Sequence, residues 1–124
     1  MSHKQFAECI EACYECADTC DHCAVACLAE DDPKPMARCI ELDMDCAQVC
    51  RLAAAYMARG SEFVSAMCGI CADVCETCGD ECAQHDMQHC QECAEACKRC
   101  AKLCRQMASQ QTSSGKTRTS PAMV

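Results

Sequence analysis

The sequence predicts an all-α fold, an antiparallel up-down-up-down four-helix bundle whose core is lined with cysteine. Three observations support this prediction. Cysteines recur at helical spacing in four separate runs, the residues between them favour helices, and proline, glycine or polar clusters separate the runs. Together these features predict helices of roughly 20–27 residues, each about 30–40 Å long.

The first run, CIEACYECADTCDHCAVAC (residues 9–27), holds six cysteines at steps of four, three, four, three and four residues. Such steps average about 3.5 residues, which is the period of one helix face. A strand would require alternation with period two, and that pattern is absent from the run. Acidic residues such as Glu11, Glu15 and Asp18 fall off the cysteine stripe and can stay in solvent.

The other three runs repeat the pattern. They are CIELDMDCAQVC (residues 39–50), CGICADVCETCGDEC (68–82) and CQECAEACKRCAKLC (90–104). The last two share the spacing three, four, three, four, which is an internal repeat. Alanine, glutamate, lysine, glutamine and leucine between the cysteines are good helix formers. Each run is therefore predicted to form a helix with one cysteine face.

The second run contains one exception to the cysteine rhythm. Its spacing places Asp43 where a cysteine would be expected, between Cys39 and Cys46. A small shift of the helical register would turn Leu42 inward instead. Both orientations stay open from the sequence.

The ends of the helices are indicated by local signals. Ser2 and Gln5 fit a capping box before the first helix. EDDPKP (residues 30–35) ends that helix, because proline removes a donor and clashes inside a helix. RGS (59–61) supplies a terminating glycine and a capping serine, and QHDMQH (84–89) separates the third and fourth helices. Residues 1–108 are thus expected to form one domain, followed by a polar, disordered tail over 109–124.

Composition narrows the function. The chain has 124 residues, 19 cysteines and a formal net charge of −8. A negatively charged chain does not neutralise nucleic-acid phosphates, so nucleic acid is not expected as a partner. The N-terminus lacks an apolar signal region and no apolar run is long enough to span a membrane, which leads us to expect a cytoplasmic protein. The cytosol keeps thiols reduced. Dense cysteine in that compartment indicates metal binding before disulfides.

Several other roles for the cysteines stay open as alternatives. A small buried hydrophobe is one, although leucine or isoleucine would bury more area, at roughly 25 cal/mol per Å2. A disulfide or redox protein would need a reactive pair of lowered pKa, and no CxxxC pair stands out from the rest. Structural zinc favours CxxC knuckles on turns, and iron–sulfur clusters usually take thiolates from loops.

The CxxxC pairs that a disulfide or redox protein would use number eight. They are Cys9/Cys13, Cys16/Cys20, Cys23/Cys27, Cys46/Cys50, Cys71/Cys75, Cys78/Cys82, Cys93/Cys97 and Cys100/Cys104.

Cu(I) fits this pattern best. Soft thiolates select Cu(I), and thiols at i and i+4 lie on the same helix face. A buried unpaired charge is expensive, whereas one Cu(I) per bridging thiolate makes the core neutral. The core can then bind on the order of 15–20 Cu(I) ions. Such a number indicates copper storage and not a catalytic centre. The predicted thiolate ligands are Cys9, Cys13, Cys16, Cys20, Cys23, Cys27, Cys39, Cys46, Cys50, Cys68, Cys71, Cys75, Cys78, Cys82, Cys90, Cys93, Cys97, Cys100 and Cys104.

From Cys9 to Cys104 the chain resembles the copper storage proteins. The resemblance rests on the first CxxxC ladder, on CIELDMDCAQVC and on the stretch CGDECAQHDMQHCQECAEAC. It implies Cu(I) binding inside a cysteine-lined four-helix bundle, commonly within a homotetramer. The cytosolic members carry histidines before the fourth helix, and here Met87 lies between His85 and His89. Copper chaperones or efflux proteins that would act as partners are not identified by the sequence.

Alternating helix directions give the bundle two different ends. His85, Met87 and His89 are predicted as further copper ligands at one end, where Met36 also falls. A solvated loop is the alternative for the histidines, and packing without ligation is the alternative for Met36 and Met87. The opposite end collects apolar side chains that would plug it. These are Phe6, Tyr56, Met57, Phe63, Val64 and Met67. His22 is expected on the surface.

Overall fold

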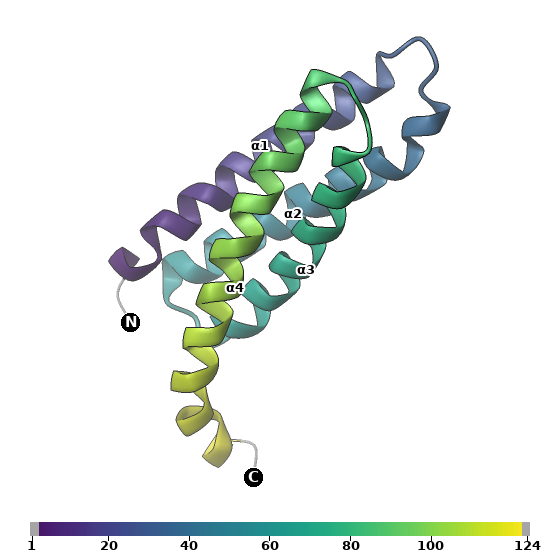
Figure 1. Ribbon diagram of the computed structural model, residues 1–124. Helices are drawn as coiled ribbons and strands as arrows, with labels where there is room; N and C mark the ends of the chain where they lie inside the picture. The colour runs from purple at the N-terminus through teal and green to yellow at the C-terminus, as the bar shows by residue number, and fades with distance from the viewer. Residues whose placement is uncertain (1–2, 123–124) are drawn as a thin grey trace.

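The computed structural model describes the backbone of residues 3–122 and the side chains of residues 4–110. It confirms the predicted four-helix bundle (Figure 1). Two short 3-10 helices accompany the four α-helices in this part of the chain. The elements are η1 His3–Phe6, α1 Ala7–Leu28, η2 Lys34–Met36, α2 Ala37–Arg59, α3 Val64–Ala83 and α4 Gln88–Ala122.

Each α-helix packs against two neighbours. Helix α1 contacts α2 and α4, and α3 contacts the same two helices from the other side of the bundle. The connections over residues 29–36 and 84–87 lie together at the upper end of Figure 1, and the connection over 60–63 lies at the lower end. We call the upper end, which carries His85 and His89, the histidine end. The lower end, which carries Phe6 and Val64, is called the apolar end.

The turn between α2 and α3 forms as predicted. Gly60 adopts the left-handed conformation with φ of 63°, which glycine favours because it has no Cβ. Its N–H donates to the Met57 carbonyl at 3.0 Å, and the Ser61 N–H donates to the Tyr56 carbonyl at 3.0 Å. The Ser61 Oγ then accepts the Phe63 N–H at 3.0 Å. At the other terminus of the bundle, Ser2 of the predicted capping box lies outside the described residues.

Helix α4 is longer than expected. It continues to Ala122, whereas a disordered tail was predicted over residues 109–124. Propagation of a nucleated helix adds one hydrogen bond per residue, so polar residues can extend it. The extension points away from the other helices in Figure 1. The Ser65 Oγ donates to the Ala108 carbonyl at 2.9 Å and ties α4 to α3 near this point. A domain boundary at residue 108 stays a prediction.

Small residues let the helices approach closely. A Cβ added at Gly79 of α3 would lie 3.1 Å from the Cys97 Cβ of α4, whereas one added at Gly69 would meet nothing within 4 Å. Close packing therefore explains Gly79 but not Gly69. Alanine fills many of the remaining core positions, and Phe6 is the one fully buried aromatic side chain among residues 4–110.

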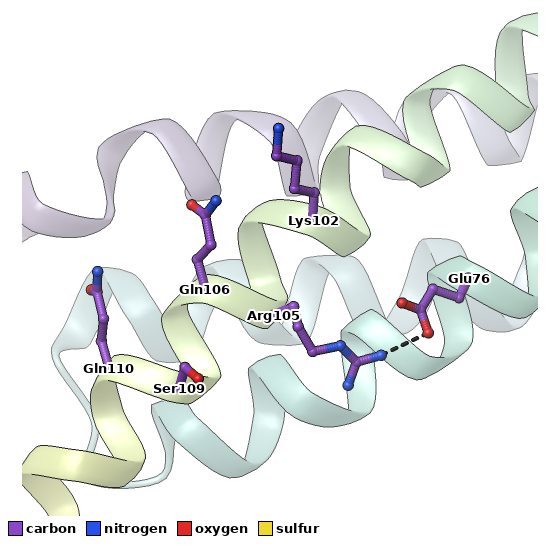
Figure 2. Close-up of a pocket in the computed structure, with 6 residues that line it drawn as sticks. All are labelled: Glu76, Lys102, Arg105, Gln106, Ser109 and Gln110. Carbon is purple, nitrogen blue, oxygen red and sulfur yellow. Dashed lines mark hydrogen bonds and ion pairs between the residues drawn. The ribbon is translucent and has the colours of Figure 1, made fainter.

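The outer surface carries ion pairs between neighbouring helices. Arg105 of α4 reaches Glu76 of α3 at 2.7 Å and Asp73 at 3.0 Å, beside a surface groove that Lys102 and Gln106 also line (Figure 2). Such exposed pairs contribute little to stability. Within the described residues, no helix has the length and apolar character needed to cross a membrane.

Candidate metal centre

All nineteen cysteines face the core. Every one is a free thiol, and the most exposed of them, Cys9, shows only 2% of its surface. Because all four helices contribute, their thiols meet along the axis of the bundle. The structure thus brings together the complete set of cysteines that the sequence analysis predicted as ligands.

Neighbouring thiols on one helix are close to each other. Five of the eight CxxxC pairs have Sγ atoms between 3.8 and 4.0 Å apart, because residues i and i+4 lie on one helix face. These pairs are Cys16/Cys20, Cys23/Cys27, Cys46/Cys50, Cys71/Cys75 and Cys100/Cys104.

Thiols on different helices lie as close as those on one helix. The Cys46 Sγ of α2 is 3.5 Å from Cys75 of α3, 3.8 Å from Cys16 of α1 and 4.0 Å from Cys97 of α4. A single sulfur can therefore reach the other three helices. This arrangement suits thiolates that bridge several metal ions.

The thiols form a continuous column instead of isolated sites. Several groups of four have Sγ atoms that all lie within 4.8 Å of one another, and successive groups share members such as Cys16, Cys20, Cys46 and Cys97. Five such groups are Cys13/Cys71/Cys100/Cys104, Cys16/Cys46/Cys50/Cys75, Cys16/Cys20/Cys46/Cys97, Cys20/Cys78/Cys93/Cys97 and Cys23/Cys27/Cys39/Cys90.

Asp43 interrupts this column with an oxygen group. Its side chain is fully buried, whereas Leu42 is only partly buried at the edge of the core, so the register left open by the sequence places Asp43 inward. The Asp43 Oδ1 accepts hydrogen bonds from Cys78 at 3.2 Å, Cys93 at 3.3 Å and Cys82 at 3.5 Å.

The same surroundings change the acidity of Asp43. Burial, followed by the nearby Cys93 and Cys78 thiols, raises the pKa of the Asp43 carboxyl to about 10. The carboxyl is therefore protonated at neutral pH in the metal-free protein. Once deprotonated it can offer an oxygen ligand beside the sulfurs.

His89 lies against the outermost group of thiols at the histidine end. Its Nδ1 is 3.5 Å from the Sγ of Cys23, 3.5 Å from that of Cys90 and 4.0 Å from that of Cys27. Its Nε2 lies 3.0 Å from the Glu30 Oε2. One ring nitrogen thus faces sulfur and the other faces a carboxylate, and the ring is not a solvated loop side chain.

His85 lies nearby in a different environment. Its Nε2 is 2.9 Å from the Glu81 Oε2, and Glu81 in turn pairs with Arg38 at 3.3 Å. Met36 is buried and Met87 is partly buried against the core, while His22 is exposed as expected. Of the three predicted ligands outside the cysteines, His89 is the one whose described contacts include thiols.

Comparison with known proteins decides the family. The family model described as copper storage protein matches residues 2–109. The chain belongs to the copper storage protein family. Curated proteins gave no match.

Solved structures of other copper storage proteins resemble this chain closely. The metal-free copper storage protein 3 from Bacillus subtilis has 48% identity and a TM-score of 0.79, with 83% of this chain and 98% of that chain covered. A Cu(I)-bound form of the protein BsCsp3 gives 48% identity and a TM-score of 0.80 over 83% of this chain and 97% of that chain. A cytosolic copper storage protein from Streptomyces lividans, loaded with five coppers, has 42% identity and a TM-score of 0.83 over 86% and 94% of the two chains.

Two of the outer thiols of this copper storage protein, Cys90 and Cys27, are protonated when no metal is bound. Burial raises the pKa of the Cys90 thiol to about 11 and also raises the pKa of Cys27. A metal ion that binds here must therefore displace protons, and its affinity will depend on pH.

The apolar end is closed by fewer residues than predicted. Phe6, Met57 and Val64 are buried, and Tyr56 and Met67 are partly buried. Phe63, however, leaves 59% of its surface exposed, so its predicted place in the plug is wrong. The reason is its position just before the first residue of α3, outside the inward stripe of that helix.

Proposed function

We propose that this protein stores many Cu(I) ions on the thiolates that line its bundle, without catalysing a reaction. The observation that carries the proposal is the continuous column of buried free thiols, in which neighbouring Sγ atoms lie as close as the 3.4 Å between Cys39 and Cys82. Thiolates are the ligands that Cu(I) prefers, and sulfurs at these separations can bridge adjacent ions. Solved relatives described as Cu(I)-bound support the same conclusion.

The geometry supports zinc or disulfide chemistry less well. Separate tetrahedral zinc sites need separate sets of four thiolates, whereas Cys16 and Cys46 each belong to two neighbouring groups. Four thiolates on one Zn2+ would also leave uncompensated negative charge in a dry core. Cu(I) at about one ion per thiolate leaves the core neutral, so the whole column can be filled.

A Cu(I) titration of the reduced, metal-free protein against a strong Cu(I) chelator tests this function. We expect saturation at on the order of 15–20 ions per chain, since each thiol can exchange a proton for metal. The variant His22→Ala, which changes an exposed side chain, serves as the control and should bind the same amount. Saturation at one or two ions would reject storage.

We further propose that Cu(I) enters at the histidine end. Three features support this end. His89 contacts the thiols of Cys23, Cys27 and Cys90, and the two connections at this end finish with Met36 and Met87. The opposite, apolar end is filled by the buried side chains of Phe6, Met57 and Val64. A neutral imidazole can hold Cu(I) before any thiol proton has left. The nineteen cysteines, with His85, Met87 and His89 as exchange ligands, are the proposed copper-binding residues.

The assembly and location of the protein are also proposals. We propose a cytoplasmic homotetramer that binds neither membrane nor nucleic acid. The relative from Streptomyces lividans is described as cytosolic, and exposed apolar side chains such as Val25, Leu28 and Met44 offer area for contacts between copies. Light scattering coupled to gel filtration tests the assembly, and a monomer at micromolar concentration would overturn it.

A further inference from the structure

Glu30 contacts His89 on the side of the imidazole ring that faces away from the thiols. The His89 Nε2 is 3.0 Å from the Glu30 Oε2, while Nδ1 faces Cys23 and Cys90 at 3.5 Å each. His89 keeps 14% of its side chain exposed and Glu30 keeps 36%. The carboxylate can therefore stay hydrated while it holds the ring.

The chemistry of this contact specifies a tautomer. An ionised carboxylate only accepts hydrogen bonds, so Nε2 must carry the proton that it donates to Glu30. In the neutral ring Nδ1 then has a free lone pair, which points at the thiols. The other tautomer would direct an N–H toward those sulfurs and leave Nε2 without a proton beside a negative oxygen.

We propose that Glu30 is a positioning residue that keeps His89 in the Nε2-protonated form and so presents Nδ1 to incoming Cu(I). This inference deepens the proposed function and rests on it. Carboxylates behind a ligating histidine orient the ring and raise its basicity. Glu30 would act through His89 without touching the metal.

The local fold explains why Glu30 can reach this position. It follows the last turn of α1, where its N–H donates to the Cys27 carbonyl at 3.2 Å. His89 lies in the first turn of α4, and the two connections meet at the histidine end (Figure 1). A residue of the first connection thus orients a ring of the last helix.

A second pair at the same end has the same chemistry. The Glu81 Oε2 lies 2.9 Å from the His85 Nε2, and Arg38 holds Glu81 from the other side at 3.3 Å. Both histidines of this end are therefore paired with a glutamate through Nε2. Of the two pairs, the Glu30–His89 pair is the one whose other ring nitrogen, Nδ1, has described contacts with thiols.

The test compares Glu30→Ala, Glu30→Gln and the control Asp31→Asn, which removes an equal charge from the same exposed connection. Nitrogen-15 NMR of the reduced, metal-free protein, at a pH where the ring is neutral, reports the tautomer of His89. We expect the Nε2-protonated form in the wild type, in Asp31→Asn and in Glu30→Gln, whose amide oxygen can still accept the hydrogen bond. Glu30→Ala should shift His89 to a mixture of tautomers.

Stopped-flow Cu(I) loading supplies the second readout. Loss of a carboxylate behind a ligating histidine typically weakens affinity or activity by about 10–100-fold, so Glu30→Ala should load about 10-fold more slowly. Final capacity should not change, and Asp31→Asn should load like the wild type. In a His89→Ala background, Glu30→Ala should add no further slowing, because its effect passes through His89.

Two outcomes would overturn the proposal. They are an unchanged His89 tautomer in Glu30→Ala, or equal slowing by Glu30→Ala with and without His89. Circular dichroism of each variant establishes that the bundle is intact. If the wild type itself saturated at one or two ions, the storage function would fail, and the NMR result would still decide whether Glu30 sets the tautomer.

Discussion

The Cys78 thiol donates a hydrogen bond to Asp43 across the interface between α3 and α2, with 3.2 Å between Sγ and Oδ1. Asp43 also contacts Cys39, a member of the outermost thiol group, at 3.8 Å and Cys93, a member of a deeper group, at 3.3 Å. The acid therefore lies between the outer thiols near His89 and the rest of the column.

The burial of Asp43 predicts a pH-dependent stability of the metal-free protein. Its pKa rises from 3.8 to about 10 on folding, so the folded state holds a proton that the unfolded state releases above pH 4. The free energy of unfolding should thus fall as pH rises from about 4 toward 10, by up to about 1.4 kcal/mol per pH unit.

Replacing Asp43 by asparagine should remove this slope. The amide side chain of Asp43→Asn would need no proton to fold, and we expect the variant to be more stable at neutral pH by about 1–4 kcal/mol. Urea unfolding between pH 5 and pH 8, under reducing conditions, measures the difference, with the exposed Asp45→Asn as control. Parallel pH profiles for wild type and Asp43→Asn would show that Asp43 is ionised in the fold.

The glycines of α3 provide a matched pair for packing. Gly69→Ala should stabilise the protein by about 1 kcal/mol, because alanine favours the helix and the new Cβ meets nothing within 4 Å. Gly79→Ala should destabilise it by about 1–3 kcal/mol, since its Cβ would press on Cys97 at 3.1 Å. Thermal unfolding of both variants checks this, and equal effects would mean that α3 and α4 are less closely packed.

Removal of one CxxxC pair should lower copper capacity only partly. Cys16 and Cys20 take part in several groups that share other thiols, so the double variant Cys16→Ala/Cys20→Ala should lose a few ions and keep the rest. Titration against a chelator followed by metal analysis gives the number. Complete loss of Cu(I) binding would instead indicate a single cooperative centre.

Removal of both histidines should change rates more than capacity. We expect His85→Ala/His89→Ala to slow Cu(I) uptake and chelator-driven release, while the thiols keep the final amount of copper almost unchanged. His89→Ala alone should account for most of the slowing, because only His89 has described contacts with Cys23 and Cys90. Stopped-flow loading decides this, and unchanged rates would place the entrance elsewhere.

The metal-free protein should already be helical. Protonated thiols are compact and uncharged, so the core can close before copper binds, unlike a zinc finger. Far-ultraviolet circular dichroism of the reduced protein should show a helical spectrum without metal. A random-coil spectrum that becomes helical only on addition of Cu(I) would contradict this.

The sequence by itself determined the four helices and the inward direction of the cysteines. Steps of three and four residues put thiols such as Cys16, Cys20 and Cys23 on one helix face whatever the rest of the chain does, because the helical period is a local property. The glycine of the α2–α3 turn could be predicted for the same reason, since its backbone conformation depends on its own lack of a Cβ.

Only the tertiary structure decided which of the remaining side chains join the site. Asp43 rather than Leu42 faces the thiols because the rotation of α2 is set by packing against its neighbours. His89 rather than His85 contacts sulfur, and Phe63 points to solvent, because these positions depend on how the connections approach the helix ends. The Glu30–His89 contact joins residues 59 positions apart, and no local period relates such residues until the helices have packed.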